Sequence, residues 1–172
     1  MSLAFNYLTP KKSFGTTIDT TDSNHNTMAQ KDLKIFIADS DDYCTFVYKQ
    51  LLQELGYKSI YTMVDADSCI NSLVLAPDVI FLDYSINNFE GLNILKKIKG
   101  INPDIHVILL SQIEDMNSSA DGIKFGAYDL ILKGGIEEEH IKMVLENISH
   151  LNKTKSKTTK YNVFQKVASF FW

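Results

Sequence analysis

The sequence contains no arginine, only two cysteines and three prolines, and no long apolar run. All 17 basic residues are therefore lysines, so the chain lacks the guanidinium groups that bind phosphates and base edges in a bidentate manner. This absence argues against direct nucleic-acid binding. No apolar run reaches the roughly 18 residues of a transmembrane helix, and the first residues do not form a secretory signal. We expect a cytoplasmic protein with no transmembrane segment.

The motifs of several enzyme classes are also missing. The sequence has no G-x-G-x-x-G, P-loop or G-x-S-x-G pattern, and its four histidines are scattered. Cys44 and Cys69 do not have metal-ligand spacing, so we expect reduced thiols. These absences argue against a nucleotide- or flavin-binding enzyme and against a hydrolase, and we expect a protein that is not an enzyme.

Charge is distributed unevenly along the chain. Residues 32–150 contain 19 acidic residues and 9 lysines, whereas residues 151–172 contain five lysines and no acid. The first 31 residues are rich in Thr, Ser and Asn and show no sustained periodicity. The pattern predicts a flexible leader (1–31), one globular domain (32–151) and a basic amphipathic tail (152–172).

Apolar residues in the tail recur at helical spacing, namely Val163, Phe164, Val167, Phe170 and Phe171. This spacing predicts a short amphipathic helix. Such a helix could pack on its own domain, dock to a partner protein or lie on an anionic membrane, and the sequence leaves these three alternatives open.

The domain alternates short apolar runs with amphipathic segments five times, which predicts an α/β fold: a doubly wound parallel sheet with helices on both faces. The expected strands are Lys34–Ala38, Ser59–Thr62, Val79–Asp83, Ile105–Leu110 and Tyr128–Leu132. The expected helices are Asp42–Leu55, Ala66–Leu75, Glu90–Lys99, Asp115–Phe125 and Glu137–Leu151. In the first helix Phe46, Leu51, Leu52 and Leu55 recur at helical spacing, and Asp42 is the expected N-cap.

Polar residues follow four of these strands. Asp39-Ser40-Asp41-Asp42 follows the first, Asp83 ends the third, Ser111 follows the fourth and Lys133 follows the fifth. In a parallel sheet the carboxyl ends of the strands meet at one edge, where ligands of such folds bind. Acids on adjacent strands repel one another unless a cation lies between them, and oxygen ligands suit Mg²⁺. We therefore expect a cation-dependent site at this edge.

These residues resemble those of a response-regulator receiver domain, the phosphorylated partner of sensor histidine kinases. The resemblance covers residues 33 to about 150. The segments that carry it are the acidic cluster, Leu55-Gly56-Tyr57, Asp83 with its loop to Gly91-Leu92, Ser111, and Phe125-Gly126-Ala127-Tyr128-Asp129 with Lys133. It implies the flavodoxin-like strand order 2-1-3-4-5.

The resemblance also implies a role for each residue. Asp83 would accept a phosphoryl group from the phosphohistidine of a sensor histidine kinase or phosphotransfer protein. Mg²⁺ would be held by Asp39, Asp83 and the backbone carbonyl of Ser85, with Asp41 or Ser40 as a further ligand. Ser111 and Lys133 would contact the phosphoryl oxygens. The expected function is that of a single-domain response regulator that signals to a downstream protein, with a dimer left open.

Three positions depart from the family pattern. Ser40 stands where the family has a second acid, Leu130 where it has an aromatic switch residue, and Gly134 where it has a proline in a cis peptide. A cis bond before a residue other than proline costs about 2.5–4 kcal/mol, so we expect a trans peptide here. These departures support an alternative function, a pseudo-receiver that mediates protein contacts without phosphorylation.

Overall fold

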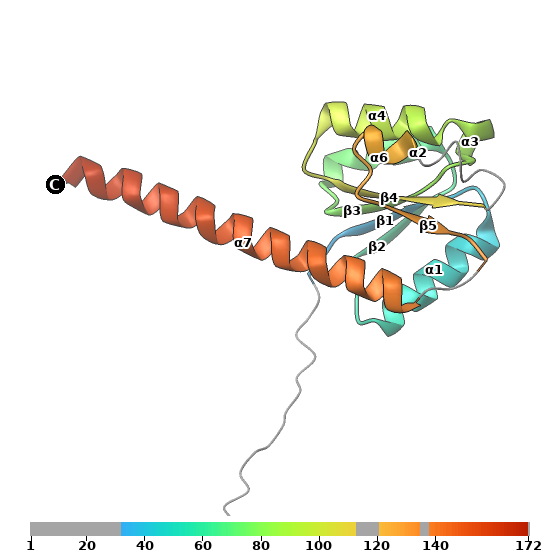
Figure 1. Ribbon diagram of the computed structural model, residues 1–172, viewed down its shortest axis with the longest axis horizontal. Coiled ribbons are helices and arrows are strands. Elements are labelled where there is room, and N and C mark those ends of the chain that lie inside the picture. The colour runs from blue at the N-terminus through green and yellow to red at the C-terminus, as the bar shows by residue number, and fades with distance from the viewer. Residues whose placement is uncertain (1–31, 113–120, 135–137, 172) are drawn as a thin grey trace, which may run out of the picture.

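The computed structural model describes residues 32–112, 121–134 and 138–171. Its five strands form one parallel sheet in the order β2-β1-β3-β4-β5, which confirms the predicted fold class (Figure 1). The strands are β1 (Ile35–Ala38), β2 (Ile60–Met63), β3 (Val79–Asp83), β4 (His106–Ser111) and β5 (Asp129–Leu132). Each lies within one residue of its predicted bounds at either end. The predicted leader, residues 1–31, lies outside the described residues.

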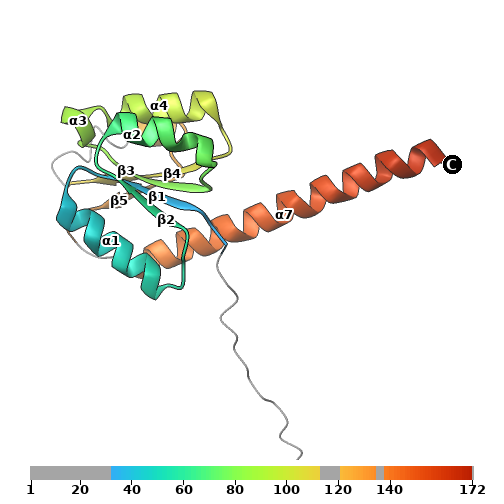
Figure 2. The ribbon, with the colours of Figure 1, turned by 180° about the vertical axis from the view of Figure 1, so that it is seen from behind.

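The helices cover both faces of the sheet (Figures 1 and 2). They are α1 (Asp42–Glu54), α2 (Ala66–Asn71) with the 3-10 turn η1 (Ser72–Leu75), α3 (Ile86–Phe89), α4 (Gly91–Ile101), α6 (Asp121–Lys124) and α7 (Glu138–Phe171). The four-residue helix α3 was not predicted from the sequence. Of the helix predicted over Asp115–Phe125, residues 115–120 lie outside the described part, and α6 covers Asp121–Lys124.

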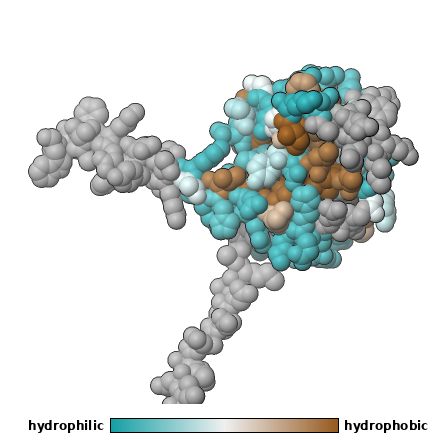
Figure 3. Space-filling model, viewed as in Figure 1, coloured by the Kyte–Doolittle hydropathy of each residue, from teal (hydrophilic) through white to brown (hydrophobic). Residues whose placement is uncertain are grey.

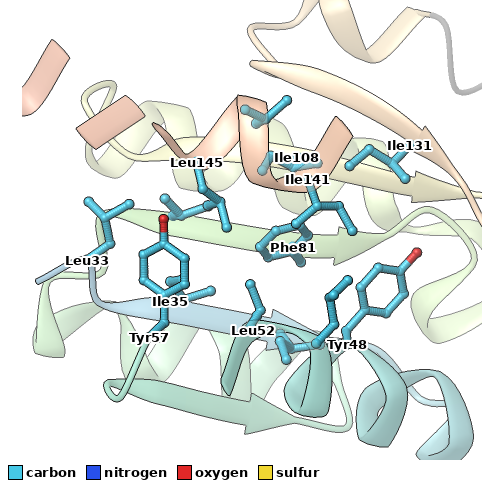
Figure 4. Close-up of a cluster of buried hydrophobic side chains, with 14 of the residues drawn as sticks. Leu33, Ile35, Tyr48, Leu52, Tyr57, Phe81, Ile108, Ile131, Ile141 and Leu145 are labelled. Atoms are coloured by element: carbon cyan, nitrogen blue, oxygen red, sulfur yellow. The ribbon is translucent and has the colours of Figure 1, made fainter. Parts of the chain in front are cut away.

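Alternate side chains of the central strands enter two separate cores, because successive residues of a strand point to opposite faces. On one face, Ile35, Ile37 and Phe81 pack against α1 and α7 (Figure 4). On the other face, Phe36, Ile80 and Leu82 pack against α2, α3 and α4. The residues of β3 from Val79 to Leu82 are fully buried, as expected for a central strand covered on both faces.

The N-terminus of α1 differs from the prediction. Asp41, not Asp42, is the N-cap, and its carboxylate accepts hydrogen bonds from the backbone N–H groups of Tyr43 and Cys44 at 2.8 and 3.2 Å. The prediction was wrong by one residue because a cap is defined by its extended backbone, which Asp41 has and Asp42 lacks. Phe46, predicted on the core side, is 59% exposed, since the buried side of α1 is formed by Tyr48, Leu51 and Leu52.

The tail is helical, as predicted, but it does not form a short element of its own. The last helix of the domain continues without a break, so that α7 runs from Glu138 to Phe171. Its first turns are part of the core through buried Ile141, Val144, Leu145 and Ile148. Its C-terminal half leads away from the domain, which also argues against packing of the tail on its own domain (Figures 1 and 2).

Two polar contacts fix the point where α7 leaves the domain. The Asn152 side chain donates to Asp78 at 3.3 Å, and Lys155 forms an ion pair with Asp104 at 2.8 Å. Asp78 also accepts a 2.8 Å hydrogen bond from the backbone N–H of Lys34, next to β1. The helix is therefore attached near the N-terminal ends of the strands, at the edge opposite the expected site.

Candidate functional site

Three of the predicted site residues converge at the carboxyl edge of the sheet. Asp39 follows β1, Asp83 ends β3 and Lys133 follows β5. The Nζ of Lys133 lies 2.7 Å from Oδ2 of Asp39 and 2.7 Å from Oδ1 of Asp83. Since β1 and β3 are paired neighbours, one ammonium group bridges two carboxylates that would otherwise face each other unscreened.

The site is buried, so its charges interact strongly. Asp39 and Asp83 are 1% and 3% exposed. Burial raises the pKa of the Asp83 carboxyl, and the neighbouring Asp39 raises it further, outweighing Lys133 and the Ser85 N–H. Burial alone would lower the pKa of the Lys133 amine, but the two carboxylates hold that pKa above its ordinary value. The two carboxylates and the one ammonium group give the cluster a net negative formal charge, which favours binding of a further cation.

Replacing Asp83 with asparagine is expected to stabilise the fold at neutral pH. The folded-state pKa of Asp83 is raised, so folding disfavours the ionised form of its carboxyl group. The protonated carboxyl contributes stability at low pH, and this contribution is lost as pH rises through the folded-state pKa. A gain of about 1 kcal/mol corresponds to roughly 2–4 °C in a chain of this size. Thermal unfolding at pH 7 measures the gain, which should shrink in acid. A variant less stable than wild type at pH 7 would contradict the prediction.

Ser111 lies at the C-terminal end of β4 with its side chain fully buried. Its hydroxyl donates a 3.0 Å hydrogen bond to the carbonyl of Gln112, and its own carbonyl accepts from the backbone N–H of Lys133 at 2.7 Å. The second bond ties the end of β4 to the residue that bridges the two acids. Ser111 therefore belongs to the same edge, although no contact of its hydroxyl with the acids is present.

The acids that follow β1 have separate roles. Asp39 remains in the site, where its Oδ1 accepts from the backbone N–H of Asp41 at 2.9 Å. The carboxylate of Asp41 is engaged in capping α1, and its hydrogen bonds to the backbone of Cys44 and Tyr43 lower its pKa. Ser40 and Asp42 are exposed. Of the four residues, only Asp39 therefore contacts the Asp83–Lys133 pair.

Gly91 holds the loop behind Asp83 in place. Its N–H donates to the carbonyl of Tyr84 at 3.1 Å, so the first turn of α4 lies directly on the end of β3. A Cβ atom at position 91 would lie 2.6 Å from the backbone carbonyl oxygen of Tyr84 and 2.8 Å from the backbone carbonyl oxygen of Asp83. Only glycine allows this approach. The sequence showed Gly91 as part of the family pattern, but not this structural reason.

The residues at this edge offer Mg²⁺ two buried carboxylates, but no third acidic ligand is found beside them in the described part of the chain. Oδ2 of Asp39 is buried, and its partner in the described part of the chain is the Lys133 ammonium at 2.7 Å, so Mg²⁺ would have to share this oxygen with Lys133. Two convergent carboxylates near a backbone turn at Ser85 form an oxygen donor set of the kind that Mg²⁺ prefers. No group of three acidic, histidine or cysteine ligands is found among the described residues.

The altered positions have clear local structures. The backbone of Gly134 has a φ of +107°, which proline cannot adopt, and the described residues contain no cis peptide, as predicted for this bond. Leu130 is half-buried and packs against the core on the α4 side of the sheet. It lies beside Leu109 of β4. Position 130 thus supports packing and provides no aromatic ring for a switch.

No helix among the described residues is long and apolar enough to cross a membrane.

Half-exposed apolar residues gather on the face that carries α6 and β5 (Figure 3). Ile123 and Phe125 are 51% and 42% exposed, and Leu130 and Leu132 are only partly covered.

Residues 35–145 match the family model described as the response regulator receiver domain. Among curated proteins, the nitrogen assimilation regulatory protein NtrX of Azorhizobium caulinodans is 31% identical over 58% of this chain and 22% of its own. The DNA-binding transcriptional regulator NtrC of Proteus hauseri is 24% identical over 78% of this chain. The match spans only 28% of the NtrC sequence.

Solved structures of receiver domains share the fold of this chain. The receiver domain of NtrX from Brucella abortus superposes with a TM-score of 0.62 at 26% identity. The match covers 67% of this chain and 98% of that domain. The BeF3-activated DrrB receiver domain superposes with a TM-score of 0.59 at 27% identity, and the match covers 67% of this chain and 96% of that domain.

Proposed function

This chain belongs to the family of response-regulator receiver domains, and we propose that it accepts a phosphoryl group on Asp83 and signals through protein contacts. The observation that carries the proposal is the geometry around Asp83, whose buried carboxylate lies 2.7 Å from Lys133 beside Asp39. The donor would be the phosphohistidine of a sensor histidine kinase or phosphotransfer protein. Signalling by the domain alone, in the cytoplasm, is part of the proposal.

The proposed reaction needs positioning and charge neutralisation more than covalent catalysis. A carboxylate oxygen of Asp83 attacks the phosphorus atom, an O–P bond forms, and the N–P bond to the histidine breaks with its electron pair returning to the imidazole. Lys133 neutralises the phosphoryl oxygens that enter beside it, and rotation of the buried Ser111 hydroxyl provides a hydrogen-bond donor at the same edge. In this role the protein is a phospho-acceptor and not an enzyme acting on a separate substrate.

Mg²⁺ is part of the proposal. Asp39, Asp83 and the backbone carbonyl of Ser85 would hold it, and the chemistry that it supplies is neutralisation of charge on the phosphoryl group. The net negative charge of two buried carboxylates that share one ammonium group supports this assignment. Because the Asp41 carboxylate caps α1 and Ser40 is exposed, the site offers two carboxylates. We therefore expect a lower affinity for Mg²⁺ than that of a site with three acidic ligands.

Incubation with acetyl phosphate and Mg²⁺, followed by intact mass spectrometry, tests the proposal. We expect an adduct of one phosphoryl group that disappears in Asp83→Asn and in the presence of a chelator. Asp41→Asn is the matched control, because an asparagine at this position still caps α1 and the adduct should persist. An undiminished adduct in Asp83→Asn would refute the assignment of Asp83.

A pseudo-receiver is the second candidate, favoured by the absence of a three-acid cluster among the described residues. It would use the same fold for protein contacts without phosphorylation. The same experiment distinguishes the two, because a pseudo-receiver yields no Mg²⁺-dependent adduct. In either case the half-exposed apolar residues of α6 and β5 favour a downstream protein target or a dimer over nucleic acid.

A further inference from the structure

The C-terminal half of α7 extends beyond the domain to which its first half is attached. Among the described side chains, Lys155 is the farthest along α7 that contacts the domain, through Asp104. The backbone remains helical to Phe171 and leads away from the sheet in both views (Figures 1 and 2). At 1.5 Å per residue, Phe171 is about 24 Å beyond this last contact.

The sequence of this extension combines lysines with apolar residues at helical spacing, which are called the apolar stripe below. It contains five lysines and no acid, at positions 153, 155, 157, 160 and 166. Val163, Phe164, Val167, Phe170 and Phe171 then recur at intervals that an α-helix brings to one side. Aromatic residues beside lysines on a helix are the composition that favours the interface of an anionic membrane.

Charge and the length of the apolar repeat argue against pairing with a second copy of the chain. Pairing with a second copy in parallel would bring two lysine-rich segments together, and the apolar repeat covers far less than the three to four heptads of a coiled coil. The domain itself carries ten more acidic residues than lysines over residues 32–150 and is repelled by an anionic surface. The apolar residues begin at Val163, about 12 Å along the helix from Lys155, which exceeds the Debye length of about 8 Å at physiological salt, so much of this repulsion is screened.

We propose that residues 153–172 of this chain bind anionic lipid bilayers peripherally, with the lysines near the headgroups and the apolar stripe at the acyl boundary. The helix α7 then serves as a tether that is continuous with the core of the domain. This proposal does not depend on phosphorylation of Asp83.

Binding of the full chain to vesicles tests the proposal, because Trp172 is the only tryptophan and lies within the segment. We expect co-sedimentation and a blue shift of tryptophan emission with phosphatidylglycerol-containing vesicles. Neither should occur with pure phosphatidylcholine vesicles, and added salt should weaken the binding. No blue shift and no sedimentation with the anionic vesicles, or equal binding to the neutral ones, would overturn the proposal.

Matched variants separate the apolar and the charged contributions. Val167→Glu should abolish binding, whereas Val74→Glu, the same change at an 86% exposed valine of the domain, should leave it unchanged. The double variant Lys157→Gln/Lys160→Gln should bind about thirtyfold more weakly, from about 1 kcal/mol per lysine. Lys142→Gln, an exposed lysine in the attached half of α7, should have little effect.

Two further outcomes would replace the proposed partner. A dimer in light scattering that Val167→Glu dissociates, in a chain that does not bind the vesicles, would assign the stripe to a second copy. A shift of Trp172 emission by duplex DNA, without any shift by anionic vesicles, would assign the lysines to nucleic acid. Either result overturns the membrane assignment.

Discussion

Replacing Lys133 with methionine is expected to lower the free energy of unfolding by about 3–5 kcal/mol, the usual cost of leaving a buried charge without its partner. The two carboxylates that Lys133 bridges, Asp39 and Asp83, are both almost fully buried. Without the ammonium group they repel each other in a medium that screens them poorly. Urea unfolding at pH 7 measures the loss.

The dependence of this loss on pH and Mg²⁺ distinguishes it from a simple packing defect. The folded-state pKa of Asp83 is already raised, and removal of Lys133, which lowers it, raises it further. The stability that the protonated carboxyl contributes is lost as pH rises through this pKa, so the variant should approach wild type as pH falls. Under the proposed metal assignment, Mg²⁺ should stabilise the variant more than wild type, since it replaces the missing positive charge.

Lys124→Met provides the matched control. Lys124 forms an ion pair with Asp121 at the same 2.7 Å distance, but the two side chains are 77% and 50% exposed. Solvent screens such a pair, so its loss should cost far less stability than the loss of Lys133. If the Lys133 and Lys124 variants lose similar stability, the bridge between Asp39 and Asp83 does not have the energetic role assigned here.

Gly91→Ala is expected to destabilise the domain by about 1–3 kcal/mol and to slow phosphorylation of Asp83 by tenfold or more. The added Cβ would lie 2.6 Å from the carbonyl oxygen and 2.7 Å from the Cα of Tyr84. These are backbone atoms that cannot move aside without shifting the end of β3. The clash therefore displaces Asp83, and the acetyl phosphate reaction together with thermal unfolding measures both consequences.

Gly100→Ala in the same helix should have the opposite effect on stability. A Cβ at Gly100 meets nothing within 4 Å, so the substitution only removes the conformational freedom of a glycine within a helix. The expected gain is roughly 0.5–1 kcal/mol. If both variants gain stability, the close approach of α4 to Tyr84 is not a constraint on the site.

The sequence alone predicted the sheet and the site edge because both depend on local patterns. The apolar run ending in Asp83 identifies a buried strand, and the carboxyl ends of parallel strands share one edge. The bridging position of Lys133 could not be predicted in this way, because it depends on the distance between residues 94 and 50 positions apart in the chain. The proposed metal and phosphoryl roles of these residues remain predictions.

The errors have physical reasons as well. The cap of α1 moved from Asp42 to Asp41 because either acid can cap a helix and only the backbone conformation decides. The four residues of α3 are too few to show a helical period. The tail was separated from the last helix because its lysine-rich segment lacks apolar residues, yet lysine is a good helix former and α7 continues through it.

Beyond its attachment through Asn152 and Lys155, α7 is a rod-like extension whose far end moves when the angle of the helix to the domain changes. Because the helix is fixed at the edge of the sheet opposite Asp83 and extends about 24 Å beyond Lys155, a small rotation at the attachment point is magnified at Phe171. A tilt of about 5° displaces that end by roughly 2 Å for this length of helix. Repacking of Ile141, Val144, Leu145 or Ile148 in the core would thus produce a measurable displacement at the far end of the chain.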